Sequence, residues 1–177
     1  MIYAFIADGF EEIEALSVVD ILRRADLDVK TISVTNKLSV CGAHGIEIKT
    51  DDIIDNIENY DMIFLPGGYP GYVNLEKSEK LIEEIKKAYS ENKYIAAICA
   101  APSILGKLEI LKNKSACCFP SFEEHLIGAN VLYDDVVVSD KIITSRGAGT
   151  AHKLGFKIVE LYKGKAFSDK LAQQMIY

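Results

Sequence analysis

The chain is ordered around the stretch Tyr94-Ile95-Ala96-Ala97-Ile98-Cys99-Ala100-Ala101-Pro102. An apolar run of strand length ends there at a cysteine, and a helix-like segment, Ser103–Leu111, follows. A strand, a sharp turn and a helix, with a nucleophilic side chain at the turn, form a nucleophile elbow. Small residues flank the cysteine because such a turn leaves no room for larger ones. We therefore predict that Cys99 is the reactive residue; the competing interpretation is a buried cysteine that acts as a small hydrophobe.

Length, composition and charge narrow the class of protein. The 177 residues are enough for a single domain over 1–177 with a sizeable core. Apolar residues make up 49% and charged residues 26%, which is ordinary for a soluble globular protein. A net charge of −6 and the lack of a Lys/Arg-rich patch argue against a nucleic-acid partner. No apolar run approaches the ~20 residues of a membrane span, so we expect no membrane association.

The N-terminus and the cysteines indicate the compartment. Met1 to Phe5 lacks the basic region and cleavage site of a signal peptide and is interpreted as a first strand. The four cysteines show no disulfide-like or CxxC spacing. Reduced thiols and a cytoplasmic location are therefore expected.

Strand-like runs alternate with helical periodicities. Strands are expected at Ile2–Ala7, Leu27–Val34, Asp61–Leu65, Tyr94–Ile98, Ser115–Phe119 and Lys141–Thr144. Helices are expected at Glu11–Ala25, Ser78–Ser90, Ser103–Leu111, Thr150–Tyr162 and Phe167–Met175. Less regular segments are a hairpin of Ser39–Cys41 with Ile46–Ile48, a short helix or turn in Asp51–Asn59, and a hairpin or bent strand pair in Val131–Val138. The alternation predicts an α/β fold with a parallel sheet covered on both faces.

Three loops are expected at one edge of this sheet. They are Asp8–Glu14 after the first strand, Pro66–Gly71 after the Asp61–Leu65 strand, and the turn at Cys99. Ligands of open α/β sheets bind beyond the carboxyl ends of the strands. The coincidence of these loops favours a functional site at Cys99 over a core cysteine.

A cysteine at a helix N-terminus has its thiolate favoured by the dipole and by free N–H groups. We therefore expect a thiol pKa well below the ~8.5 of a free thiol, whereas a normal or raised value would favour a buried core residue. The N–H of Ala100, directly after the nucleophile, is one candidate oxyanion donor. Gly68 is the second, because a glycine lets the backbone approach a ligand closely.

The candidate acid partner is one of Glu11, Glu12 and Glu14. Glu14 has Val18 and Ile21 at i+4 and i+7, so it lies over an apolar stripe. A carboxyl placed there would have a raised pKa. The other two glutamates also have apolar neighbours one turn on, so periodicity leaves all three open, including the interpretation that they simply occupy a helix N-terminus.

Other patterns are weaker. Gly147-Ala148-Gly149 resembles part of a dinucleotide fingerprint, but His152 stands where a third glycine is needed. The histidines and the adjacent Cys117-Cys118 do not form a metal-ligand spacing, so neither a metal nor a cofactor is expected. Among the histidines, His125 is the candidate for a pair with Cys99 through space.

Four motifs together resemble the ThiJ/PfpI superfamily, in the branch of the Parkinsonism-associated protein deglycase and its bacterial relatives. The resemblance covers essentially the whole chain. The motifs are Asp8-Gly9-Phe10-Glu11-Glu12-Ile13-Glu14, Leu65-Pro66-Gly67-Gly68, Ala96-Ala97-Ile98-Cys99-Ala100-Ala101-Pro102 and Thr144-Ser145-Arg146-Gly147-Ala148-Gly149-Thr150.

The resemblance implies a flavodoxin-like three-layer sandwich that forms a homodimer. It implies a reactive cysteine on a strained elbow at Cys99 and a protonated glutamate partner at Glu14. It also implies backbone donors at Gly68 and Ala100. We further assign Gly67 and Phe119 to substrate binding.

The activity that the resemblance implies is a cofactor-independent glyoxalase or deglycase. Its substrate is methylglyoxal or the adducts of methylglyoxal on thiols and amines. A redox-sensing chaperone that uses the same cysteine is the alternative, and a small-substrate hydrolase or peptidase is a third.

This sequence departs from the family pattern at two positions. Ala100 stands where the peptidase-like branch has a histidine, which argues against a protease triad. Phe119 stands where some deglycase relatives carry a histidine, which leaves Glu14 as the main proton-transfer group.

Overall fold

Strands and helices alternate along the computed structural model, which describes residues 1–177. The strands are β1 (Ile2–Ile6), β2 (Val29–Ser33), β3 (Ser39–Cys41), β4 (Glu47–Lys49), β5 (Asp52–Ile53), β6 (Met62–Leu65), β7 (Tyr94–Ile98), β8 (Ser115–Ala116), β9 (Asn130–Val131), β10 (Val136–Ser139) and β11 (Ile142–Ser145). The helices are α1 (Glu12–Arg24), α2 (Gly71–Lys77), α3 (Glu79–Ser90), α4 (Pro102–Lys107), α5 (Ala151–Lys163) and α6 (Lys165–Gln174). Short 3₁₀ turns are η1 (Ile54–Asn56), η2 (Glu123–His125) and η3 (Ala148–Thr150).

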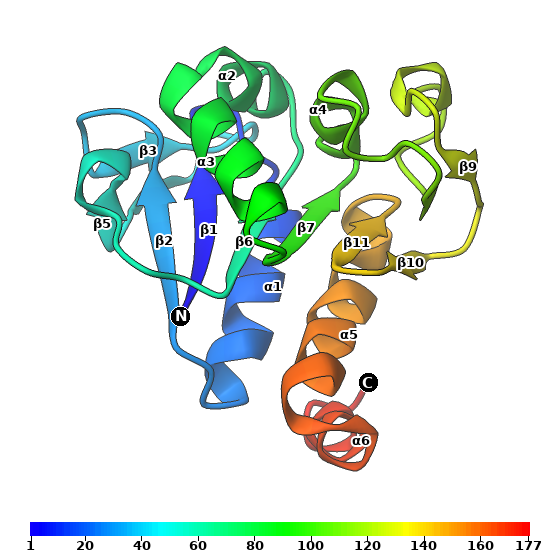
Figure 1. Cartoon of the computed structure of the whole chain (residues 1–177). Helices are drawn as coiled ribbons and strands as arrows, with labels where there is room; N and C mark the ends of the chain where they lie inside the picture. Colours follow the sequence, from blue (N-terminus) through cyan, green and yellow to red (C-terminus); the bar gives the residue numbers. More distant parts are fainter.

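The central sheet has seven strands in the order β10-β11-β7-β6-β1-β2-β5. All neighbouring strands are parallel except β10, which runs antiparallel to β11 at one edge. The order reverses between β1 and β6, because the chain builds outward in one direction from β1 to β2 and in the other from β6 to β7. In Figure 1 the arrows of β1 and β7 point toward the end of the molecule where α2 and α4 lie. The loops after β1, β6 and β7 therefore meet at the switch point, where such sheets bind ligands.

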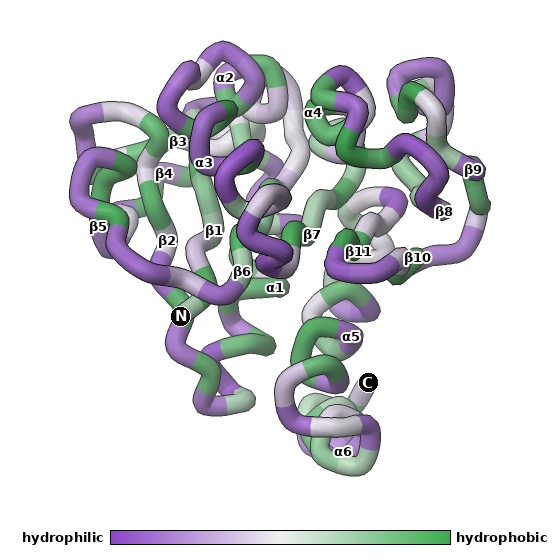
Figure 2. The backbone as a smooth tube through the Cα atoms, viewed as in Figure 1, coloured by the Kyte–Doolittle hydropathy of each residue, from purple (hydrophilic) through white to green (hydrophobic).

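Alternation along the strands creates two apolar layers. In β1, Ile2, Ala4 and Ile6 face α1 and α5, whereas Tyr3 and Phe5 face the side covered by α2, α3 and α4. Each face belongs to its own buried cluster, and the two clusters are separated by the sheet. Figure 2 shows β1 and β7 in hydrophobic colours, while much of α3 facing the viewer is hydrophilic. The predicted α/β fold, a three-layer sandwich with a mostly parallel sheet, is confirmed.

Helix α1 carries the candidate glutamates and is fixed by α5. Gly155 of α5 lies directly against Ile21 of α1, since a Cβ on Gly155 would be 2.9 Å from the Ile21 Cδ1 atom. Ile21 and its neighbour Leu22 are fully buried. This close approach of two helices positions the first turn of α1 beneath the elbow. None of the helices has the length and apolar character that a membrane span requires.

Several expectations for the connecting segments were wrong. Helix α2 was not expected, because its sequence begins with glycine after a proline and has no clear apolar repeat. The Asp51–Asn59 segment contains a strand as well as a turn, since β5 pairs with β2 at the sheet edge before η1 begins. Pairing with β2 decided the strand, and the start of α2 is held by the Gly71 N–H, which donates to the Gly9 carbonyl. Local sequence periodicity reports neither contact.

The region after the elbow also differs from the expectation. Helix α4 ends at Lys107 and not at Leu111, so it is only six residues long. Val131–Val138 does not form a hairpin with itself: β9 pairs with β8, and β10 pairs with β11. The strand expected over Ser115–Phe119 is limited to Ser115–Ala116.

Candidate active site

Cys99 sits in a strained turn between β7 and α4. Its φ is +64°, a left-handed conformation that costs a non-glycine residue roughly 1–2 kcal/mol. The turn is held from both sides: the Cys99 N–H donates to the Ser145 carbonyl at 3.0 Å, and the Phe119 N–H donates to the Cys99 carbonyl at 2.8 Å. Pro102 opens α4, where its missing N–H is not needed. The predicted elbow is thus present, and a strained cysteine fixed by β11 and by the segment after β8 is unlike an ordinary core cysteine.

Glu14 lies beside the elbow cysteine. Its side chain is only 1% exposed, and its Oε2 atom accepts the Gly67 N–H at 2.8 Å. The Glu14 carboxyl and the Cys99 thiol are close enough to shift each other's pKa. Gly67 makes the arrangement possible, because a Cβ there would lie 2.7 Å from the Cys99 Cβ and 2.8 Å from Glu14 Oε2. The Gly67 N–H is taken up by Glu14, so Gly67 holds the carboxyl in place.

The structure separates the three glutamates that periodicity left open. Of the three, only Glu14 shifts the pKa of Cys99. Glu12 is buried but faces the β3–β4 hairpin, where it binds His44. Glu11 is partly exposed at the start of α1. Successive residues of a helix point about 100° apart, so one step along α1 decides which carboxyl meets the sulfur.

Burial raises the pKa of Glu14 from 4.5 to about 7. The charge of Glu11 acts in the same direction, whereas hydrogen bonds from Cys99 and Gly67 act against it. The predicted rise in pKa is confirmed. A carboxyl with this pKa exchanges its proton near neutrality, as a general acid–base group must.

Burial, the Glu14 charge and the hydrogen bond to Glu14 raise the pKa of the Cys99 thiol to about 12. The N–H groups of Ala100 and Gly68 lower it, but by less. The expectation of a depressed thiol pKa was therefore wrong, and a raised value taken alone favours a buried core residue; the strained φ of Cys99 and the Glu14 carboxyl beside it are what indicate a reactive cysteine. Helix α4 has only six residues, so its dipole is weak beside the effect of burial and of a neighbouring carboxylate. The resting pair holds its proton on sulfur, and the thiol becomes nucleophilic when Glu14 takes that proton.

The two predicted oxyanion donors lie near the sulfur, since the N–H groups of both Ala100 and Gly68 lower the pKa of the Cys99 thiol. Gly68 reaches this position with a φ of +93° and with the Glu11 nitrogen only 2.3 Å from where its Cβ would be. No residue with a side chain fits there. The glycine is required by the geometry that brings an N–H to the thiol.

Phe119 borders the site. Its ring is 45% exposed and lies next to Gly147, whose Cβ would be 3.3 Å from the ring and 3.9 Å from Glu14 Oε1. His125, the candidate partner through space, stacks edge-on against Phe122 and has no hydrogen bond to Cys99. The position of Phe119 fits its predicted contact with substrate, and the position of His125 gives it no contact with the thiol.

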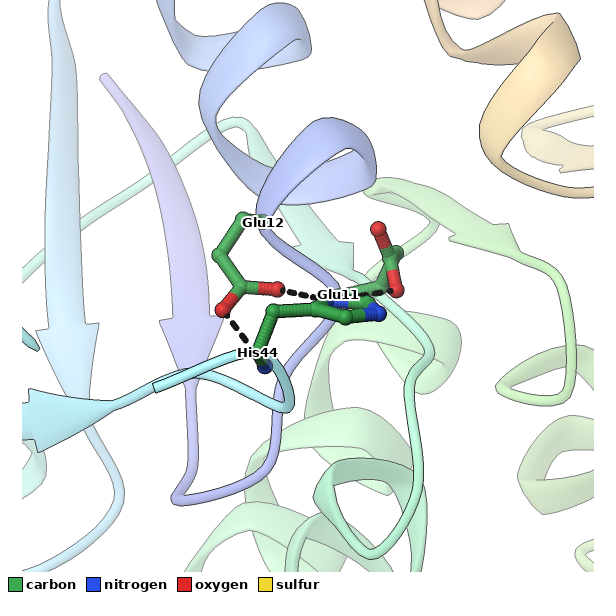
Figure 3. A group of neighbouring side chains, drawn as sticks. All are labelled: Glu11, Glu12 and His44. Atoms are coloured by element: carbon green, nitrogen blue, oxygen red, sulfur yellow. Dashed lines mark hydrogen bonds and ion pairs between the residues drawn. The ribbon is translucent and has the colours of Figure 1, made fainter. Parts of the chain in front are cut away.

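The structure also brings together a second group of titratable side chains, Glu11, Glu12 and His44, which the sequence did not predict. Figure 3 shows Glu11 and Glu12 facing His44 from the β3–β4 hairpin. The His44 N–H donates to Glu12 Oε1 at 2.8 Å, and His44 Nδ1 lies 2.8 Å from Glu12 Oε2 and 3.6 Å from Glu11 Oε2. The signal in the sequence was Gly42, whose missing Cβ leaves room for the Glu12 carboxylate.

One ligand atom from each of these three residues lies within 4.8 Å of the others, so they have the chemistry to hold a divalent cation. Burial by itself raises the pKa of Glu12, but hydrogen bonds led by that of His44 bring it below its usual value. The hydrogen bond to Glu12 raises the pKa of His44. The buried carboxylate is thus satisfied by the histidine, and the group ties the hairpin to the start of α1.

The remaining candidate motifs have structural roles. Cys117 and Cys118 are both buried, and the Cys117 N–H donates to Thr144 Oγ1 at 2.9 Å. The Gly147–Gly149 loop is closed by Thr150, whose Oγ1 accepts the Gly147 N–H at 3.1 Å. Because the Gly147 N–H is already bound by Thr150 inside the protein, the Gly147–Gly149 loop does not behave as a phosphate-binding turn.

The fold and the site define a class: an α/β sandwich with a cysteine elbow coupled to a buried glutamate. The DJ-1/PfpI family model matches residues 1–161, and the chain belongs to this family. Protein dj-1beta of Drosophila melanogaster is 31% identical over 175 residues, 97% of this chain and 94% of that protein. A Caenorhabditis elegans relative, glutathione-independent glyoxalase DJR-1.2, is 32% identical over 168 residues, 93% of this chain and 89% of its own length.

Solved structures show the same fold. Oxidized Toxoplasma gondii DJ-1 superposes with a TM-score of 0.95 at 34% identity, covering 99% of this chain and 97% of that one.

Two Arabidopsis thaliana relatives, the DJ-1 homologs B and A, are 37% and 36% identical over 90% of this chain. The chain spans only 37% and 42% of the length of those two proteins.

Proposed function

We propose that this protein is a glyoxalase or deglycase that needs no cofactor and acts on methylglyoxal or on its adducts with thiols and amines. The observation that carries the proposal is the close pair of Cys99, in its strained turn, and the buried Glu14, with the N–H groups of Gly68 and Ala100 near the sulfur. The C. elegans relative is named a glutathione-independent glyoxalase, and this name of a similar protein supports the same activity here.

The reaction uses one proton carrier. Glu14 takes the thiol proton as the Cys99 sulfur bonds to the aldehyde carbon, and it returns a proton to the new alkoxide oxygen. Until then the Gly68 and Ala100 N–H groups stabilise the negative oxygen. Glu14 then removes the hydrogen of the former aldehyde carbon as a proton, which gives an enediolate. The hydroxyl proton of that carbon passes to the former ketone oxygen as Glu14 delivers its proton to the neighbouring carbon.

This shift oxidises the first carbon to a thioester and reduces the second to an alcohol. Water then hydrolyses the thioester, which releases lactate and the free thiol. In sum, methylglyoxal and water become lactate, so no external oxidant or reductant is needed. On an adduct, the thiol or amine leaves as well.

The direct test is to incubate the protein with methylglyoxal and to follow lactate. We expect wild type to form lactate and Cys99→Ser to form none above the uncatalysed rate, because a serine hydroxyl is a far weaker nucleophile. Cys41→Ser, at the exposed cysteine outside the site, should match wild type. Equal rates for wild type and Cys99→Ser would end the enzyme proposal.

A redox-sensing role is the second candidate, and the same N–H groups favour it. They would hold the oxygens of a sulfinate at Cys99, formed when two peroxide molecules each transfer one oxygen atom to the sulfur and leave as water. A relative solved in an oxidized form is consistent with this role. We expect mass spectrometry after mild peroxide to find two added oxygens at Cys99. Oxidation greater at the exposed Cys41 than at Cys99 would contradict a dedicated sensor.

A further inference from the structure

A run of aromatic rings borders the elbow and joins two loops that are far apart in sequence. We call this run, which consists of the rings of Tyr69, Tyr72, Phe122, Phe119 and His125, the aromatic wall. Its ring centroids are 6.5 Å apart for Tyr69 and Tyr72, 5.5 Å for Tyr72 and Phe122, 6.5 Å for Phe122 and Phe119, and 5.8 Å for Phe122 and His125. The Tyr72–Phe122 and Phe119–Phe122 pairs are edge-on, a favoured arrangement for aromatic side chains.

The wall is next to the reacting groups. At one end, Phe119 donates its N–H to the Cys99 carbonyl, and its ring lies over Gly147 beside the Glu14 carboxyl. At the other end, Tyr69 directly follows the oxyanion donor Gly68. The wall therefore connects the loop after β6 with the segment after β8 around the thiol.

The two end rings are not core residues. Tyr69 is 76% exposed and Phe119 is 45% exposed. The rings between them, Tyr72 and Phe122, are partly buried and hold the wall in position. The exposed surface of Phe119 lies beside the Glu14 carboxyl and is available to a ligand, and burying such a surface is favourable.

We infer that the aromatic wall selects 2-oxoaldehydes whose ketone carbon carries an aromatic or large apolar substituent, in preference to methylglyoxal. This inference rests on the proposed function. When sulfur attacks the aldehyde carbon, the substituent two bonds away lies within reach of the Phe119 ring. A methyl group covers little of that surface, whereas a phenyl ring covers it and forms an aromatic pair.

The test compares phenylglyoxal with methylglyoxal, by initial rates of mandelate and lactate formation. We expect wild type to have a kcat/KM for phenylglyoxal about three- to tenfold above that for methylglyoxal, the size of one aromatic pair. Phe119→Ala should bring the ratio near one, mostly through the phenylglyoxal KM. Phe119→Tyr, which keeps the ring, should restore the wild-type ratio.

The matched control is Tyr89→Ala, at a ring that is 44% exposed on α3 and outside the wall. It should leave the ratio unchanged. The inference would be overturned if the ratio of kcat/KM for phenylglyoxal to that for methylglyoxal is below one in wild type, or if Phe119→Ala does not change this ratio. In either case, lactate formation by wild type would still support the proposed function. Absence of both products would overturn the proposed function, and the inference with it. Because Phe119 is exposed, the variant should fold, and an unchanged thermal unfolding curve verifies this.

Discussion

Glu14→Gln will lower kcat/KM for methylglyoxal by about 100-fold or more, because general acid–base catalysis contributes roughly 10²–10⁴. Glutamine keeps the shape and the acceptor for the Gly67 N–H, but it exchanges no proton with the thiol. In wild type we expect kcat/KM to rise with pH with an apparent pKa of about 7, since Glu14 must lose its proton to act as a base. The pH–rate profile measures this.

The same substitution will change how folding stability depends on pH. The folded-state pKa of Glu14 is raised from 4.5 to about 7, so the folded protein binds more protons than the unfolded chain between these values. Stability from this group is fully present below pH 4.5 and is lost as the pH rises through about 7. The loss amounts to about 3 kcal/mol at 1.36 kcal/mol per pKa unit.

Urea unfolding at several pH values checks the linkage. Relative to Glu14→Gln, wild type should lose stability between pH 4.5 and 7, while Glu79→Gln at the exposed start of α3 should follow wild type throughout. A constant difference between wild type and Glu14→Gln over this range would mean that the carboxyl does not titrate there. An unchanged rate in Glu14→Gln would remove it from the mechanism.

Gly68→Ala is the second substitution with a large expected effect, on stability and on rate. Its φ of +93° is unfavourable for alanine by about 1–2 kcal/mol. The new methyl would also lie 2.3 Å from the Glu11 nitrogen and 2.6 Å from the Gly9 carbonyl oxygen, backbone atoms that cannot move aside cheaply. Such overpacking adds about 1–3 kcal/mol. We expect a total of about 2–5 kcal/mol in the free energy of unfolding.

Gly164→Ala separates the two causes. Gly164 has a similar φ of +84°, but nothing lies within 4 Å of its Cβ position, so only the conformational cost applies. Since its ψ of 159° lies in a region that is essentially restricted to glycine, we expect the substitution to cost about 1–3 kcal/mol and to leave the rate unchanged. Gly68→Ala should also slow lactate formation roughly 10²–10³-fold, the effect of losing one oxyanion donor. Equal destabilisation by the two substitutions would show that the tight approach at Gly68 is not rigid.

Local sequence patterns located the strong elements because those elements bury whole stripes of side chains. Strands β1, β6 and β7 are short, almost wholly apolar runs, and α1 and α3 have apolar residues at helical spacing. The position of Cys99 at the end of a central strand follows from such a run. Elements with few buried side chains were missed: α2, β5 and the β8–β9 pair are held by backbone contacts with distant segments.

The candidate site divides in the same way. The cysteine, the glycines and the group of three glutamates are visible in the sequence, and motif resemblance selected Glu14 among the three. The His44 contact with Glu12 was not visible, because it joins a hairpin to a helix 32 residues away. The aromatic wall joins the β6 loop to the segment after β8, and no periodicity links those rings.

By itself, the sequence determined which residues stand at the turn after β7 and which backbone positions need glycine. Both depend on side-chain volume and on local conformation. The tertiary structure places Glu14, the carboxyl that motif resemblance selected, next to the sulfur, and it alone decided that the Cys99 pKa is raised and not lowered. A pKa depends on burial and on every charge and donor within a few ångströms, and here these come from three separate segments: α1, the β6 loop and the elbow.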